Sequence, residues 1–350
     1  MPESDGPIDW AAAVRSGRRM APTGPAVSPA EAAEAVADLR EFSGRAELIV
    51  RDTTELGRGL PIDDAEVVDR PGWIGATAEG MERLAAPAVA KLAAATGGRM
   101  AGQMTRGVAG QQVGFILAFL SGKVLGQFDP LGGNPARPGR LLLVAPNIVK
   151  VERELGAHPT DFRLWVCLHE STHRLQFTAV PWLRDYFISL VAEFADTADT
   201  DPAEMLRRAM ATIRGEPGPD ERRLSWMEGI QSPQQRAVFD RVMALMSLLE
   251  GHADYVMDAV GPAVVPSVTA IRASFTERRR KGAGPVDRVI RALLGMEMKL
   301  AQYVNGGAFV RGVVDEVGMS RFNAVWQSAE TLPTRAEIAD PAAWIRRVHG

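Results

Sequence analysis

The segment Leu164–Phe177 constrains this chain more than any other, because its pattern makes physical sense only on a helix. It contains His169-Glu170-x-x-His173, so the two histidines are four residues apart. Side chains four apart lie on one face of an α-helix, and both imidazoles can therefore reach one metal ion with Glu170 beside them. Apolar residues recur at helical spacing along a neighbouring stripe. We expect a helix whose histidine pair lies at the border of the core.

The ends of this helix are marked as well. Pro159, Thr160 and Asp161 predict its start, with Thr160 as the N-cap and Asp161 near the positive end of the helix dipole. Pro181 predicts its end. Cys167 lies about 200° around the helix from the first histidine, so we interpret it as a core thiol and not as a ligand.

A third ligand has to come from another part of the chain, because catalytic zinc takes three protein ligands and a water molecule. We favour Glu250, which lies four residues before Asp254 on a second predicted helix. Asp254 would accept the outer N–H of one imidazole and fix its tautomer. His252 is the alternative ligand, but it lies about 200° around the helix from Glu250 and no carboxylate accompanies it in that role.

This residue set predicts zinc-dependent hydrolysis. His169, His173 and Glu250 would hold the ion and leave a position for water, and Glu170 would take the proton of that water as general base. A further donor could stabilise the oxyanion. The sequence does not choose among the three candidates for that donor, which are Tyr255, Tyr303 and Arg311.

Three other interpretations stay open. The histidines could hydrogen-bond locally beside a solvated Glu170. A zinc ion could be structural, in a non-catalytic helical interaction protein, with His252 or Asp254 closing its coordination. The chain could also be a metal-free helical interaction protein.

The two parts of the metal motif, His169-Glu170-x-x-His173 and Glu250-x-x-x-Asp254, resemble the gluzincin arrangement of thermolysin-type proteases. Most of the chain resembles a family of zincin-like hydrolases that are labelled as associated with biosynthesis of a deazaflavin coenzyme. That label reflects which genes lie near theirs and not a demonstrated reaction. Four further segments carry this resemblance: Gly126-Gln-Phe-Asp129, Leu141–Asn147, Phe309–Gly318 and Phe322–Trp326. The resemblance implies a zincin-like core around the metal helix and cleavage of a peptide or other amide bond.

The rest of the chain predicts a mainly α-helical fold, α+β at most, with a small sheet. A flexible segment over residues 1–27, in which residues 10–13 could form a docking helix, would precede one domain over residues 28–350 with two possible lobes around the metal cleft. Leu141–Val144 is the clearest strand candidate and follows a Pro/Gly-rich loop over residues 126–140. That strand could be the edge strand that pairs with substrate, as the resemblance suggests, or a core strand.

The helix with the third ligand is expected to begin at Ser232 and Pro233, with the serine as N-cap and the proline in the first turn. Gly251 lies inside this helix beside the candidate ligand. Its missing side chain has two explanations. It could let another backbone or a substrate approach closely, or it could simply allow tight packing, which is the simpler explanation.

Composition bears on location and partners. A net charge of −3 over 350 residues gives no general reason to expect nucleic-acid or membrane binding. The single cysteine excludes an internal disulfide and fits a reducing compartment, so we expect a cytoplasmic protein. The expected cofactor is one zinc ion and the expected partner is a peptide or small amide substrate, with no nucleic acid and no membrane. The oligomeric state does not follow from the sequence.

Overall fold

The computed structural model describes residues 6–95, 103–134, 137–196, 233–281 and 296–350. Within them the chain is mainly α-helical with one small sheet, which confirms the predicted fold class. It forms two compact units, one of residues 1–181 with 253–282 and the other of residues 182–252 with 283–350. None of the described helices combines the length and the apolar run that a bilayer crossing needs.

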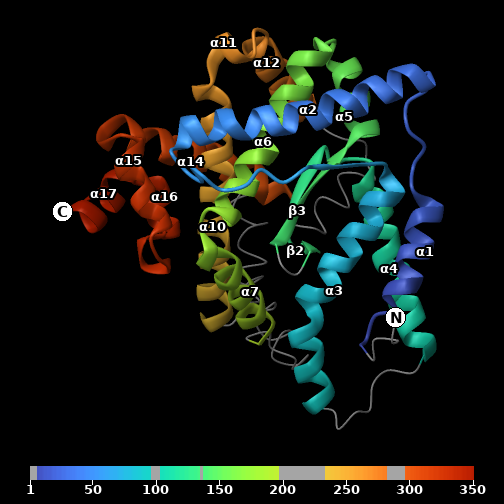
Figure 1. The fold of residues 1–350 in the computed structure, drawn as a ribbon. Coiled ribbons are helices and arrows are strands. Elements are labelled where there is room, and N and C mark those ends of the chain that lie inside the picture. The colour runs from blue at the N-terminus through green and yellow to red at the C-terminus, as the bar shows by residue number, and fades with distance from the viewer. Residues whose placement is uncertain (1–5, 96–102, 135–136, 197–232, 282–295) are drawn as a thin grey trace. The chain divides into compact units, whose positions relative to one another are not determined.

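The first unit has a three-stranded sheet with helices on both faces (Figure 1). Its strands are β1 (Glu66–Val68), β2 (Gly126–Asn134) and β3 (Arg137–Val144). Its helices are α1 (Trp10–Met20), α2 (Pro29–Thr54), α3 (Arg70–Ala95), α4 (Gln103–Ser121), α5 (Ala145–Leu155), α6 (Pro159–Thr178), α11 (Gly261–Val264) and α12 (Val268–Lys281). The strand order is β1-β3-β2, with β1 parallel and β2 antiparallel to β3.

The central strand β3 is buried on both faces. Leu141 and Leu143 pack into a core with α2, α5 and α6, whereas Leu142 and Val144 pack against α3 and α4. Because β3 has a hydrogen-bonded neighbour on each side, the interpretation of these residues as a substrate-binding edge strand is wrong. The core-strand alternative is confirmed. The edge position beside α6 belongs to β2.

The described residues between 126 and 140, predicted as a loop, form β2 and the beginning of β3. The loop prediction was wrong because a bulge interrupts the alternation of side chains: the register shifts between Asp129 and Gly133. Asp129 is 4% exposed, and its carboxylate accepts the main-chain N–H groups of Leu131 and Gly132, both at 3.0 Å. A buried carboxylate thus satisfies the donors that the bulge removes from the sheet.

Residues 10–20, predicted as part of a flexible segment, form α1. Asp9 caps this helix, because its Oδ1 accepts the N–H of Ala12 at 2.7 Å. Gly17 lies so close to α4 that a Cβ atom on it would be 3.1 Å from the carbonyl oxygen of Gly114. The flexible-segment prediction is therefore wrong for these residues, and they form the docking helix instead.

The helix α6 confirms the predicted metal helix but not its predicted cap. The N-cap is His158, since Pro159 takes the first helical position and Thr160 lies within the first turn. The carboxylate of Asp161 accepts the N–H and the hydroxyl of Ser267, at 2.8 and 2.6 Å, just before α12 begins. These bonds attach the start of α6 to α12.

A buried ionic cluster attaches α6 to α2. Glu47 on α2 forms ion pairs with Arg51 and with Arg174, and all three side chains are at most 8% exposed. Burial lowers the pKa of Arg174, and the Glu47 carboxylate opposes that shift. Arg174 also donates to the carbonyl oxygen of Asp63 at 2.5 Å. Because Arg174 directly follows His173, this cluster holds the part of α6 that carries the motif.

The second unit is helical in its described part. Its helices and 3-10 turns are α7 (Pro181–Asp196), α14 (Met296–Val317), α15 (Met319–Phe322), η1 (Asn323–Trp326), η2 (Ala329–Thr331), α16 (Arg335–Ala339) and α17 (Pro341–His349). The helix α10 (Pro233–Ala259) is shared between the units: its residues up to 252 belong to the second unit, and its later residues belong to the first. Its start at Pro233 agrees with the prediction, and the predicted cap Ser232 lies outside the described residues.

The close approach of another backbone, one of the two explanations for Gly251, is confirmed. A Cβ atom on Gly251 would lie 2.1 Å from the carbonyl carbon of Gly306, so α10 and α14 touch through their main chains. A Cβ atom on Gly306 would in turn lie 2.0 Å from the carbonyl oxygen of Ser247. Each helix requires the missing side chain of the other.

Replacing Glu47 by Gln should lower the free energy of unfolding of the first unit by about 3 kcal/mol, because two buried guanidinium groups lose their counter-charge. The matched control is Glu154→Gln, which breaks an exposed 3.8 Å pair with Lys150 and should change the free energy by less than about 0.5 kcal/mol. Urea denaturation followed by circular dichroism measures both. Equal effects of the two substitutions would contradict the role given to the buried cluster.

Candidate metal centre

The two histidines of α6 face each other as the spacing predicts. Nε2 of His169 lies 3.2 Å from Nε2 of His173. Two nitrogen ligands at tetrahedral positions on one zinc ion would be about 3.3 Å apart, given ordinary Zn–N bonds. The imidazole pair therefore has the separation that a shared ion requires.

Hydrogen bonding orients one of these rings. Nδ1 of His173 lies 2.9 Å from Oε1 of Gln176, which is fully buried one turn further along α6. Since an amide oxygen only accepts, Nδ1 carries the proton and the lone pair of Nε2 points toward the other imidazole. Nδ1 of His169 lies 3.2 Å from Sδ of Met257. Sequence reasoning missed Gln176, although its position three residues after the histidine on one helix was a usable signal.

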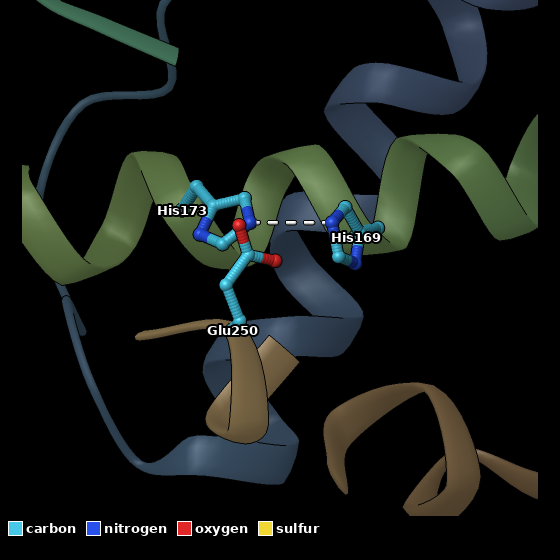
Figure 2. A group of neighbouring side chains, drawn as sticks. All are labelled: His169, His173 and Glu250. Atoms are coloured by element: carbon cyan, nitrogen blue, oxygen red, sulfur yellow. Dashed lines mark hydrogen bonds between the residues drawn. The ribbon is translucent and has the colours of Figure 1, made fainter. Parts of the chain in front are cut away.

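The carboxylate of Glu250 completes the group. Ligand atoms of Glu250, His169 and His173 all lie within 4.8 Å of one another, and the three residues are half-buried. Figure 2 shows the carboxylate pointing from α10 toward the imidazole pair. Met257, which contacts His169 within the first unit, lies two helical turns after Glu250 on the same helix. That contact brings the ligand-bearing face of α10 to the histidines.

The donor set suits zinc. Two imidazole nitrogens and one carboxylate oxygen form a ligand combination that catalytic zinc sites use, with one position left for water. Glu170, between the two histidines in sequence, is only 6% exposed and contributes no atom to this ligand group. It lies on α6 where the helix passes the first residue of β2.

Comparison with known proteins identifies the family of the chain. The chain matches the family described as zincin-like metallopeptidases over residues 8–345. It belongs to that family. A crystal structure from Chloroflexus aurantiacus, described as that of a proposed hydrolase with a novel fold, is 31% identical to the chain, with a TM-score of 0.70. The similarity covers 97% of this chain and 98% of the other. A search of curated proteins found no match. The family match and the similar crystal structure do not bear on the deazaflavin label.

The role predicted for Asp254 in this zincin-like chain is wrong. Its Oδ1 accepts from Nη1 of Arg272 at 2.7 Å, and Nε of the same guanidinium lies 2.6 Å from Asp258. Arg272 is on α12, so the carboxylate serves to join α10 to α12. The outer nitrogens of the two ligand histidines contact Gln176 and Met257 instead.

The structure also explains why His252 is a poor ligand candidate. Its ring is fully buried in the second unit, 5.5 Å from the ring of Phe322 and 5.4 Å from that of Trp326, measured between centroids. The preference for Glu250 is thereby supported, because the two side chains leave α10 on different faces. The segment Phe322–Trp326, which the resemblance singled out, supplies this aromatic surrounding.

The remaining candidates are placed as follows. Cys167 is fully buried, and burial raises the pKa of its thiol, which confirms a core residue without nucleophilic character. Tyr255 is partly buried against the core of the first unit, and Arg311 is exposed on α14. The side chain of Tyr303 lies outside the described residues. None of the three is thereby singled out as the oxyanion donor.

Replacing Gln176 by Leu should weaken zinc binding by about 10- to 100-fold, because the imidazole of His173 loses the acceptor that fixes its tautomer. Gln176→Glu is the matched control: it keeps an acceptor oxygen of nearly the same reach and should retain zinc. Competition with a chromophoric chelator measures both affinities. If the Leu variant bound zinc as tightly as the unaltered chain, the amide would have no part in the metal centre.

Proposed function

We propose that this chain is a zinc metallopeptidase that hydrolyses a peptide or related amide bond. The observation that carries the proposal is the convergence of His169, His173 and Glu250 around one point, with Glu170 buried beside the pair. Membership in the zincin-like metallopeptidase family supports a hydrolytic reaction at this point.

The metal-binding residues have separate tasks. His169 and His173 would bind the ion through Nε2, and Glu250 would bind it through a carboxylate oxygen. When bound, zinc acts as a Lewis acid that lowers the pKa of a water molecule and polarises a carbonyl group. A structural site would need a fourth protein ligand, and the two candidates for it are engaged elsewhere: His252 in an aromatic core and Asp254 with Arg272.

Glu170 would move the proton. As general base it accepts a proton from water while the water oxygen bonds to the carbonyl carbon of the substrate. It then delivers that proton to the departing nitrogen as the carbon–nitrogen bond breaks. One water molecule is consumed, and the products are a carboxylic acid and an amine. The burial of Glu170 limits the solvation of its carboxylate by bulk water.

An extended peptide is the substrate class that the architecture favours. The strand β2 is at an edge of the sheet, and it contacts the metal helix α6. Phe128 on β2 stacks on Phe177 of α6, with ring centroids 5.8 Å apart. A peptide that added to the outer edge of β2 would therefore run along the metal helix and could place a backbone carbonyl near the ion.

Glu170→Gln should leave zinc content unchanged and reduce kcat by at least about 100-fold, because the amide cannot accept the proton of water. Glu250→Gln is the matched comparison, since the same chemical change at a ligand should lower zinc content as well. Mass spectrometry of bound metal and hydrolysis of a library of internally quenched peptides measure the two quantities. Equal turnover by the unaltered chain and Glu170→Gln would remove this residue as the base.

A further inference from the structure

The segment Gly126–Asp129 opens β2, and its side chains alternate between the two helical layers. Oε1 of Gln127 accepts from the indole Nε1 of Trp73 on α3 at 3.0 Å. The next residue of β2, Phe128, stacks on Phe177 of α6 on the opposite face of the sheet. By the alternation of a strand, Gly126 faces α6 as well. This segment helped to identify the family but has no place in the ligand group.

Gly126 touches the carboxyl group of Glu170. A Cβ atom built on Gly126 would lie 2.6 Å from Cγ, 2.7 Å from Cδ and 2.9 Å from Oε1 of Glu170. Non-bonded carbon atoms prefer separations of about 3.5–4.0 Å, so a methyl group cannot share this space with the carboxyl group. The Glu170 side chain therefore lies directly against the main chain of β2.

Backbone conformation does not explain the glycine. Gly126 is absent from the described residues with positive φ, so an alanine could adopt its backbone conformation. The requirement concerns space alone. It distinguishes Gly126 from Gly133 and Gly139 further along the same hairpin, whose φ values are 79° and 106°.

Both sides of this contact are held firmly. The main chain at Gly126 pairs with Leu143 of the buried central strand, and the carbonyl oxygen of Leu125 accepts the N–H of Val144 at 2.8 Å. On the other side, Glu170 lies on α6, which Glu47 anchors by its ion pair. A carboxyl group between two fixed elements has few directions in which to point.

We propose that Gly126 is a positioning residue: the main chain of β2 at Gly126 forms a wall that directs the Glu170 carboxylate toward the point on which the histidines converge. The inference rests on the proposed function in one respect, because that function makes the carboxylate the general base. The contact itself is independent of any activity.

A double-mutant cycle on thermal stability tests the contact in the full chain. Gly126→Ala alone should lower Tm by about 3 to 8 °C, because the added methyl group overpacks the contact with the buried Glu170 side chain. In a Glu170→Ala background the same change should lower Tm by less than half as much, since the group that it strikes is gone. Gly44→Ala is the control: nothing lies within 4 Å of a Cβ atom there, and Tm should not fall.

Two results would overturn the inference. An equal loss of Tm in both backgrounds would show that the methyl group strikes something other than Glu170. An unchanged Tm after Gly126→Ala would show that the carboxyl group has room to move aside, so that β2 does not direct it.

Turnover and metal content connect the contact to the reaction. Gly126→Ala should reduce kcat by about 100-fold while the zinc content stays at that of the unaltered chain, because the base is displaced and the ligands are not. A variant with full kcat would contradict the positioning role. If the unaltered chain hydrolysed no peptide, the proposed function would fail, while the stability cycle would still decide the contact.

Discussion

The attachment of one helix determines the metal centre. The helix α6 carries both imidazoles and the proposed general base, so helical geometry sets the spacing of these residues along one helix and the packing of α6 sets where they lie. Three ionic or polar contacts place it: Glu47 with Arg174 on the side of α2, Glu152 with Arg163 on the side of α5, and Asp161 with Ser267 before α12. A rigid helix then transmits this placement to the histidines.

Glycine lets a main chain come close to a neighbouring element at two places, where α10 meets α14 and where β2 meets α6. Gly251 and Gly306 bring α10 against α14 beside Glu250, the proposed third ligand, and Gly126 brings β2 against Glu170, the proposed general base. In both places an added methyl group would displace a residue of the proposed reaction. Glycines near a metal motif thus have a geometric role that a list of ligands does not reveal.

The local parts of the structure followed from the sequence. The metal helix was predictable because the spacing of its histidines and apolar residues has the period of a helix. Glu250 was chosen because Asp254 follows it by four residues, yet that carboxylate binds Arg272 and not an imidazole. The partner of Asp254 was not predictable, since Arg272 is distant in sequence and only the packing of α10 on α12 brings them together. The strand β2 was missed because its bulge and glycines hide the alternation that identifies a strand.

Anomalous diffraction at the zinc absorption edge, from crystals of the full chain grown with zinc, tests the central claim most directly. One ion should lie about 2.0–2.2 Å from Nε2 of His169, Nε2 of His173 and a carboxylate oxygen of Glu250, with a fourth position filled by solvent. An ion bound elsewhere, or one whose fourth ligand is a protein side chain, would contradict the proposed catalytic centre.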